Sequence, residues 1–264
     1  MNKMNNYNII GDIHGRVCWK DLVIPDAINV FVGDYFDPYD DYSYEQLMRN
    51  FQEILQFKIE YPANILLLGN HDLHYLHYND SSRLDRQHSK EIQEAIMSNI
   101  HLFQLALSID NRVLVTHAGV TNEWLDLTEY DGPHMPDLIE KHINNLFLDG
   151  LVETSDGQCY YDPNVPYGLS CFTFSKCSTG FDIFGNSPTQ SPVWVRPQTL
   201  VDHNALPDYT QIVGHTQVDH IEQIPYPVWL VDCLGQKPGS LLLKINNDII
   251  EYVCNNLPTS QPEE

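Results

Sequence analysis

Five short segments of this chain place a glycine beside aspartate, histidine or asparagine, the residue types that bind metal ions and move protons. The segments are Gly11-Asp12-Ile13-His14-Gly15, Gly33-Asp34-Tyr35-Phe36-Asp37, Gly69-Asn70-His71-Asp72, Thr116-His117-Ala118-Gly119 and Gly214-His215-Thr216. Asp12 and His14 are two residues apart, so an extended backbone would direct both side chains to the same side. The pattern predicts one site assembled from distant parts of the chain.

The mixture of carboxylate, imidazole and amide ligands limits which metal the site could take. It suits manganese, iron or zinc, and it fits neither a thiolate site nor an oxygen-only calcium site. One carboxylate can bridge two cations, and two cations about 4 Å apart can hold the oxygens of an in-line phosphoryl displacement. The neighbouring glycines would let a phosphate approach the backbone closely. Such a site could therefore act on a phosphoryl group.

In this order the five segments resemble the signature of the calcineurin-like metallophosphoesterases. That signature reads GDxHG, GDxxD, GNH followed by Asp or Glu, a later HxG and a final GH. The matching motifs extend from Gly11 to Thr216, most of the chain. The resemblance implies an α/β fold, a four-layer α/β/β/α sandwich in which two packed mixed β-sheets are flanked by helices.

The resemblance also implies a role for each motif residue. Two divalent metal ions are expected as cofactors, with Asp34 bridging them. His71 corresponds to the general acid or phosphate-contacting histidine, and Asp37 to the carboxylate that orients it. The metal ligands implied are Asp12, His14 and Asp34 for the first ion, and Asp34, Asn70, His117 and His215 for the second.

Two departures narrow the branch of the family. Many members end in GHxH, whereas this chain has Gln217 at the position of the second histidine. That absence, with GDIHG and GDYFD, resembles the serine/threonine phosphatase branch and its bacterial and phage relatives, which include dinucleoside tetraphosphate hydrolases. The branch usually reads GDYVDRG, but Pro38 follows Asp37 here, so the arginine that usually holds phosphate is missing at that position.

Another arginine would therefore have to hold the phosphate. Arg196 lies in Trp194-Val195-Arg196, which resembles a Trp-x-Arg element of bacterial relatives, and a planar guanidinium can bind two phosphate oxygens at once. The alternative is a surface arginine on an edge strand. Arg16, directly after the first motif, is a further candidate. His74 and His77 follow His71 at helical spacing, and we expect them to be packed or solvated because the two-metal site is already full.

The expected function is hydrolysis of phosphomonoesters, phosphoserine or phosphothreonine in proteins among them, through attack of a metal-bound hydroxide. The expected metal is manganese, with iron or zinc as alternatives. Two other functions stay open: hydrolysis of dinucleoside tetraphosphates or other nucleotide pyrophosphates on the same fold, and a catalytically silent metal-binding interaction protein. The last would be indicated by a missing ligand or a missing acid, and this sequence lacks neither.

The spacing of apolar residues predicts the elements that position these motifs. Short apolar runs that end at the motif glycines read as strands, and helical periodicity appears between them. In such α/β chains, sites lie beyond the carboxyl ends of strands. The predicted strands are 7–10, 29–32, 65–68, 102–109, 112–116, 211–213, 228–231, 241–245 and 249–253, and the predicted helices are 44–59, 91–100 and one from Pro136 to Gly150.

Residues 121–190 form an acidic, loop-rich stretch that reads as an insertion beside the site. Its carboxylates either overhang the mouth of the site and repel polyanions or face away from it, as most charge runs do. The rest reads as one metallophosphoesterase domain over 5–255, with a disordered tail at 256–264.

Composition limits the partners. The 264 residues include 14 Lys and Arg against 36 Asp and Glu, a net charge of −22, which argues against binding nucleic acid. No CxxC pair suggests a zinc ribbon, and no apolar run suggests a signal peptide or a membrane span. We therefore expect a cytoplasmic protein that acts on a phosphorylated small molecule or a phosphoprotein. The sequence does not indicate an oligomeric state.

Overall fold

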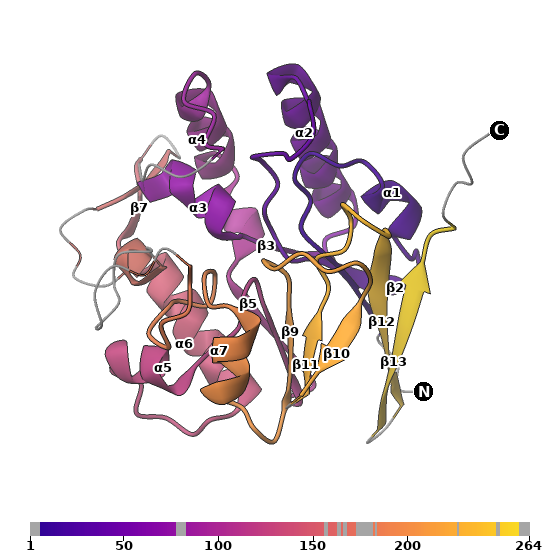
Figure 1. The fold of residues 1–264 in the computed structure, drawn as a ribbon. Coiled ribbons are helices and arrows are strands. Elements are labelled where there is room, and N and C mark those ends of the chain that lie inside the picture. Colours follow the sequence, from indigo (N-terminus) through magenta and orange to yellow (C-terminus); the bar gives the residue numbers. More distant parts are fainter. Residues whose placement is uncertain are drawn as a thin grey trace.

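Two mixed β-sheets form the framework of the chain (Figure 1). The computed structural model describes residues 6–77, 83–155, 158–162, 165, 168–172, 182, 184–225, 227–246 and 249–258. The larger sheet has six strands in the order β13-β12-β1-β2-β3-β4, and the second has five in the order β10-β11-β9-β6-β5. The expected pair of mixed sheets flanked by helices is confirmed.

In the six-stranded sheet, β1 to β4 are parallel, β12 pairs antiparallel with β1, and β13 pairs antiparallel with β12. In the five-stranded sheet, β6, β9 and β11 are parallel, and β5 and β10 are antiparallel strands at its edges. The strands are β1 (Asn6–Ile10), β2 (Ala27–Phe31), β3 (Ile65–Leu67), β4 (Phe103–Gln104), β5 (Ala106–Ile109), β6 (Val113–Thr116), β9 (Thr210–Val213), β10 (Glu222–Ile224), β11 (Val228–Leu230), β12 (Gly239–Asn246) and β13 (Ile249–Asn256).

The single strand predicted over 102–109 is wrong. The chain leaves the first sheet after β4 and enters the second at β5, and Leu105 lies between the two strands. The backbone N–H groups of Leu105 and Ala106 donate to Asn144 Oδ1 at 3.0 and 3.1 Å, so a side chain takes over the hydrogen bonds that a ladder would make. A mainly apolar run does not reveal such a crossing, because both strands are rich in buried apolar residues.

Alternate residues of β1 and β2 belong to different hydrophobic clusters. Ile9 and Val30 belong to an apolar cluster that also contains Val115 and Ile212 of the second sheet, so this cluster lies between the sheets. Ile10 and Phe31 point to the other face, into a separate cluster covered by helices. This is the two-residue period of a strand that is buried on both faces.

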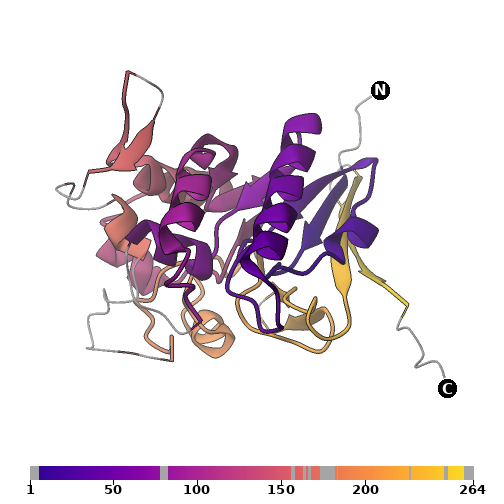
Figure 2. The same ribbon diagram turned by 90° about the horizontal axis from the view of Figure 1, so that it is seen from above.

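The helices cover the outer faces of the two sheets. Trp19 of α1 packs edge-on against Phe31 of β2, with ring centroids 5.6 Å apart, and α2 begins with a capping box at Ser43. Seen from above, α2 and α4 lie alongside each other (Figure 2). The helices are α1 (Trp19–Leu22), α2 (Tyr44–Glu60), α3 (Asn70–His77), α4 (Ser89–Met97), α5 (Asn122–Leu127), α6 (Pro136–Leu148) and α7 (Pro197–Asp202), with 3₁₀ turns at Ile100–Leu102 and Gly168–Phe172.

The acidic stretch contains α5, α6 and the hairpin of β7 (Leu151–Glu153) and β8 (Cys159–Tyr161). α6 packs against β5 and β6. Its backbone at Asp137 donates to the side chain of Asn111 at 3.2 Å, and Asn111 lies in the turn between β5 and β6. Because β6 runs from that turn to Thr116 and His117, Asp137 lies at the opposite end of the strand from the motif. The position of Asp137 therefore favours the alternative in which its carboxylate faces away from the mouth of the site.

Residues 259–264, which include most of the predicted tail, lie outside the described residues, whereas β13 continues to Asn256. Among the helices of the described part of the chain, none combines the length and apolar character that crossing a membrane requires.

Candidate active site

The five motif segments meet at the carboxyl ends of strands from both sheets. Asp12 follows β1, Asp34 follows β2, and Asn70 begins α3 just after β3. From the second sheet, His117 follows β6 and His215 follows β9. All five side chains are buried or nearly so, and the contacts below join them into one cluster. The expected convergence at one edge is present in the structure.

Asp34 lies at the centre of the cluster. Its Oδ2 atom is 3.5 Å from His14 Nε2 and 3.4 Å from His117 Nε2. Its other oxygen, Oδ1, accepts a hydrogen bond from the backbone N–H of His71 at 2.9 Å. One oxygen of Asp34 therefore faces histidines from two different motifs, which is the place a bridging carboxylate would occupy.

Asn70, His117 and His215 form the second half of the cluster. Asn70 Oδ1 lies 2.9 Å from His117 Nε2 and 2.9 Å from His215 Nδ1. The backbone N–H of His215 donates to Asp12 Oδ2 at 2.9 Å, which ties the last motif to the first. The rings of His117 and His215 are also in edge-on contact, with centroids 5.2 Å apart.

Backbone carbonyls fix a proton on Nδ1 of two of these histidines. His14 Nδ1 lies 2.9 Å from the carbonyl oxygen of Phe36, and His117 Nδ1 lies 2.9 Å from that of Val32. A carbonyl oxygen can only accept, so in each ring Nδ1 carries the proton. In both rings Nε2 is then the nitrogen that faces Asp34, an arrangement typical of metal-binding histidines.

The donor atoms fit a bound cation. Burial lowers the pKa of His14 to about 3, so its ring is neutral and the lone pair of Nε2 faces the Asp34 carboxylate. Two electron-rich atoms that face each other in a buried space are stabilised by a cation between them. With metal–ligand bonds of about 2.1 Å, neighbouring ligand atoms lie about 3.0–3.4 Å apart, close to the separations observed here. Among the described residues, Asp12 Oδ1 is buried without a hydrogen-bond partner.

The charges in the cluster also favour a bound cation. Burial opposes protonation of His117, but Asp34 and Asp12 raise its pKa to about 10. Burial and the nearby Asp232 raise the pKa of Asp12 well above its usual range. Several carboxylates thus share a buried space in which histidine is the nearest positive charge, and divalent cations would neutralise them.

Four residues of the motif segments have strained backbone conformations. His14, Asp34, Asp37 and His215 have φ angles of 44°, 53°, 55° and 63°, in the left-handed region that non-glycine residues rarely adopt. Such strain persists only where surrounding contacts hold it, and it is typical of functional sites.

Two motif glycines leave the space that the carboxylates occupy. A Cβ atom at Gly69 would overlap Asp34 Oδ1, and one at Gly214 would overlap Asp12 Oδ1. The glycines of these two motifs are therefore required by close approach of a ligand side chain.

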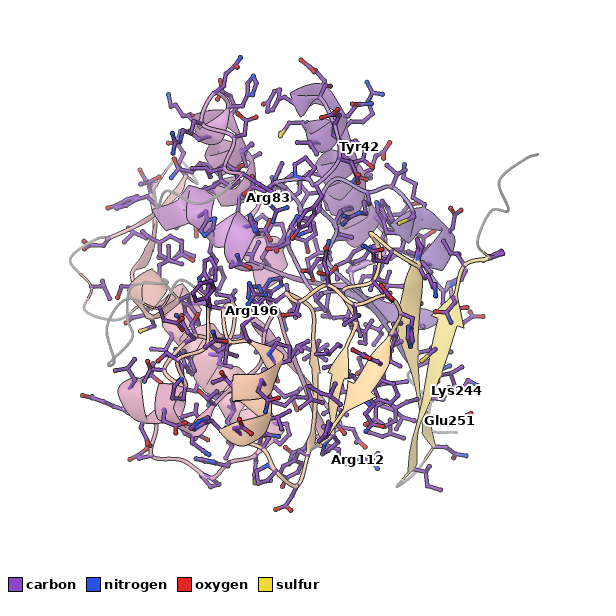
Figure 3. All side chains as sticks on the ribbon, viewed as in Figure 1. Tyr42, Arg83, Arg112, Arg196, Lys244 and Glu251 are labelled. Atoms are coloured by element: carbon purple, nitrogen blue, oxygen red, sulfur yellow. The ribbon has the colours of Figure 1, made fainter. Side chains whose placement is uncertain are left out.

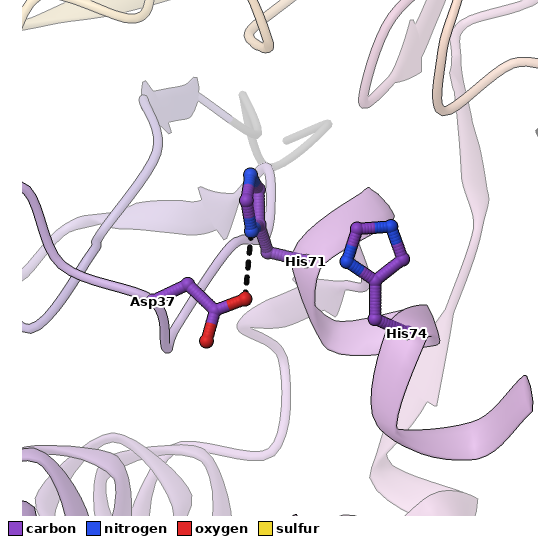
Figure 4. A group of neighbouring side chains, drawn as sticks. All are labelled: Asp37, His71 and His74. Atoms are coloured by element: carbon purple, nitrogen blue, oxygen red, sulfur yellow. Dashed lines mark hydrogen bonds and ion pairs between the residues drawn. The ribbon is translucent and has the colours of Figure 1, made fainter. Parts of the chain in front are cut away.

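Asp37 holds His71 through a hydrogen bond (Figure 4). His71 Nδ1 lies 2.7 Å from Asp37 Oδ2, and the Tyr75 hydroxyl donates to Asp37 Oδ1. Burial, with Asp37 next to it, raises the pKa of Tyr75, so the phenol keeps its proton. His74 is also buried, and its ring packs against Trp194 with centroids 5.3 Å apart. Asp37, His71 and His74 offer donor atoms within 4.8 Å of one another.

Asp72 and Asp232 are two further buried carboxylates near the cluster, and the motif pattern predicts no role for either. Asp72 is fully buried, and its carboxylate accepts hydrogen bonds from the backbone of Asp34, Tyr35 and Gly69 at 2.8, 2.8 and 2.9 Å. Asp232 follows β11, and burial together with Asp34 raises its pKa to about 6. Its place just after a predicted strand was a usable signal, since sites lie beyond strand ends.

The arginines expected to hold phosphate lie near the cluster. Arg196 Nη1 donates to the His215 carbonyl at 3.3 Å and to Thr216 Oγ1 at 3.1 Å, while Nε donates to the Phe184 carbonyl at 3.1 Å. Burial, and then Arg196, hold the pKa of His215 well below its ordinary value. Arg16 is 6% exposed and lies 3.9 Å from Asp40 Oδ2.

Comparison with known proteins agrees with this geometry. The family model for calcineurin-like phosphoesterases matches residues 7–216, so the chain belongs to that family. It is a metal-dependent enzyme that hydrolyses phosphoesters, and its acidic and histidine clusters suit divalent metal cofactors. A comparison of the sequence with curated proteins finds no match.

Solved phosphatases share the fold. One is a protein serine/threonine phosphatase from Saccharomyces cerevisiae with similarity to human phosphatase PP5, at 14% identity and a TM-score of 0.55, covering 99% of this chain and 82% of that one. Another is a mutant of a cold-active protein tyrosine phosphatase, at 16% identity and a TM-score of 0.50, covering 97% and 81%. At these identities the likeness concerns the fold.

Proposed function

We propose that the chain is a phosphomonoesterase with a centre of two divalent ions, and that it belongs to the serine/threonine-phosphatase-like branch of its family. The observation that carries the dinuclear centre is the position of Asp34 Oδ2, 3.5 Å from His14 Nε2 and 3.4 Å from His117 Nε2. The branch is supported by Gln217, which stands where a further histidine ligand would be.

Asp12, His14 and Asp34 would hold the first ion, and Asp34, Asn70, His117 and His215 the second. Manganese is the metal that this mixture of oxygen and imidazole ligands favours, with iron and zinc as alternatives. When bound, the ions supply Lewis acidity: they lower the pKa of water and balance the charge of phosphate oxygens.

His71 is the proposed proton donor to the leaving group. Asp37 accepts from Nδ1 at 2.7 Å and so orients Nε2 away from itself, and Tyr75 in turn fixes Asp37. The two donors hold the Asp37 side chain in place, and Asp37 in turn fixes the ring from which a proton would pass to the leaving group. Arg196 lies beside His215. It would bind a phosphate oxygen through the N–H groups that its present hydrogen bonds do not use.

The substrates that we propose are phosphorylated small molecules or phosphoserine and phosphothreonine in proteins. The test is release of phosphate from p-nitrophenyl phosphate by the purified chain with added manganese, followed by a panel of a phosphopeptide and a dinucleoside tetraphosphate. Hydrolysis of the ester and the phosphopeptide supports the proposal. Hydrolysis of the tetraphosphate alone would instead support the nucleotide pyrophosphohydrolase. If none of the three substrates is hydrolysed, the chain would be a catalytically silent metal-binding protein.

A further inference from the structure

Arg83 places a guanidinium directly against the proposed catalytic pair. It comes from the segment between α3 and α4, outside the five motifs. Its Nη2 atom lies 2.9 Å from His71 Nε2, and its Nη1 donates to the Asp37 carbonyl oxygen at 2.9 Å. Figure 3 labels Arg83 beside α3 and Arg196 near α7, so the two arginines come from different parts of the fold.

The contact with His71 has a defined direction. A guanidinium has no acceptor atom, so Arg83 is the donor and His71 Nε2 the acceptor. The His71 proton is then on Nδ1, where it is donated to Asp37. Arg83 therefore occupies the one ring nitrogen of His71 that faces away from Asp37.

Tyr39 supports Arg83 from a second side. The guanidinium carbon of Arg83 lies 3.6 Å from the centroid of the Tyr39 ring, a cation–π contact. The same ring lies edge-on to His14, with centroids 4.9 Å apart. Tyr39 is 52% exposed, so this stack borders the solvent-facing side of the cluster.

The charge of Arg83 is directed at neutral partners. Its hydrogen bonds go to a carbonyl oxygen and an imidazole, and among the described residues no carboxylate lies within ion-pair distance of it. A guanidinium has more N–H groups than these two bonds use. The Arg83 side chain is exposed to solvent, although it contacts the buried His71. A cation so placed is ready to bind an anion.

From this geometry we infer that Arg83 binds the phosphate group of the substrate. The residue after Asp37 is Pro38, so the loop itself supplies no arginine to hold phosphate. Arg83 comes from another segment, donates to the carbonyl oxygen of Asp37 and would take the place of the missing arginine. A phosphate oxygen would compete with His71 Nε2 for the Arg83 N–H groups, so that binding of the substrate also frees Nε2 to take up from solvent the proton that it then donates to the leaving group. The inference rests on the proposed function.

The experiment measures binding of inorganic phosphate by titration calorimetry to the manganese-loaded protein, alongside kcat and KM on p-nitrophenyl phosphate. Arg83→Gln should weaken phosphate binding about 10- to 100-fold, the range for a lost charge-assisted hydrogen bond. Arg83→Lys should lie between, because a lysine keeps the charge without the planar fork. Metal content should be unchanged in both variants.

Arg86→Gln is the matched control, since it removes the same charge from the same exposed segment. If wild type and Arg83→Gln bind phosphate equally while wild type hydrolyses the ester, the Arg83 inference is wrong and the proposed function stands. If wild type neither binds phosphate nor hydrolyses the ester, both fail. An equal loss in Arg86→Gln would show a general charge effect and would also overturn the inference.

Discussion

The carboxylate of Asp72 accepts a hydrogen bond from the backbone N–H of Asp34 at 2.8 Å, so the third motif fixes the backbone of the second. The same carboxylate binds the backbone of Tyr35 and Gly69. Asp34 has a positive φ angle and would not hold this conformation unaided. Asp72 is thus the positioning residue for the carboxylate that faces both histidines.

Replacing Asp72 should therefore be costly. Asp72→Ala leaves three buried N–H groups without their acceptor, and we expect a loss of about 3–5 kcal/mol in the free energy of unfolding. Urea unfolding of the metal-free protein measures it. Asp126→Ala, which removes an exposed carboxylate of α5, is the control and should change stability little. Equal stability of the two variants would contradict the positioning role.

Asp34 and His14 should differ in their effect on metal content. Asp34→Asn should reduce both ions, because Asp34 Oδ2 faces a histidine from each half of the cluster. His14→Ala should reduce mainly one, because its ring reaches only one side of Asp34. Metal analysis after dialysis against manganese measures both. Two tightly held ions in Asp34→Asn would show that the bridging assignment is wrong.

His71 should matter most for substrates whose leaving group needs a proton. His71→Ala is expected to lower kcat on an alkyl phosphate about 10²–10⁴-fold, the usual scale of general acid catalysis. The loss on p-nitrophenyl phosphate should be much smaller, because the departing phenolate is already stable. The ratio of the two losses is the measurement. Equal losses would indicate that His71 binds phosphate or supports the fold instead.

Tyr39 should affect phosphate binding through Arg83. Tyr39→Leu removes the ring on which the guanidinium stacks, so KM for p-nitrophenyl phosphate should rise about 3- to 10-fold with little change in kcat, as expected for a cation–π contact. Tyr39→Phe keeps the ring and should restore the wild-type KM. A Phe variant as impaired as the Leu variant would assign the effect to the hydroxyl and refute the stacking role.

The family and the location of the site could be predicted from local sequence. Gly11, Gly33 and Gly69 each follow a short apolar run, and such runs become strands whose carboxyl ends meet at one edge. The helix over 44–59 was predicted within one residue of α2, because its apolar residues recur at helical spacing. These features depend on neighbours in the chain, which a sequence displays directly.

Other features were decided only when distant segments came together. The split of 102–109 between two sheets depends on Asn144, 39 residues beyond Leu105. The orientation of the His117 ring depends on the carbonyl group of Val32, and every residue carries such a group, so the sequence does not single it out. Arg83 lies in a segment without a motif, and only the folded chain brings it 2.9 Å from His71. Local patterns specify strands, turns and ligand types, but long-range contacts assign each polar atom its partner.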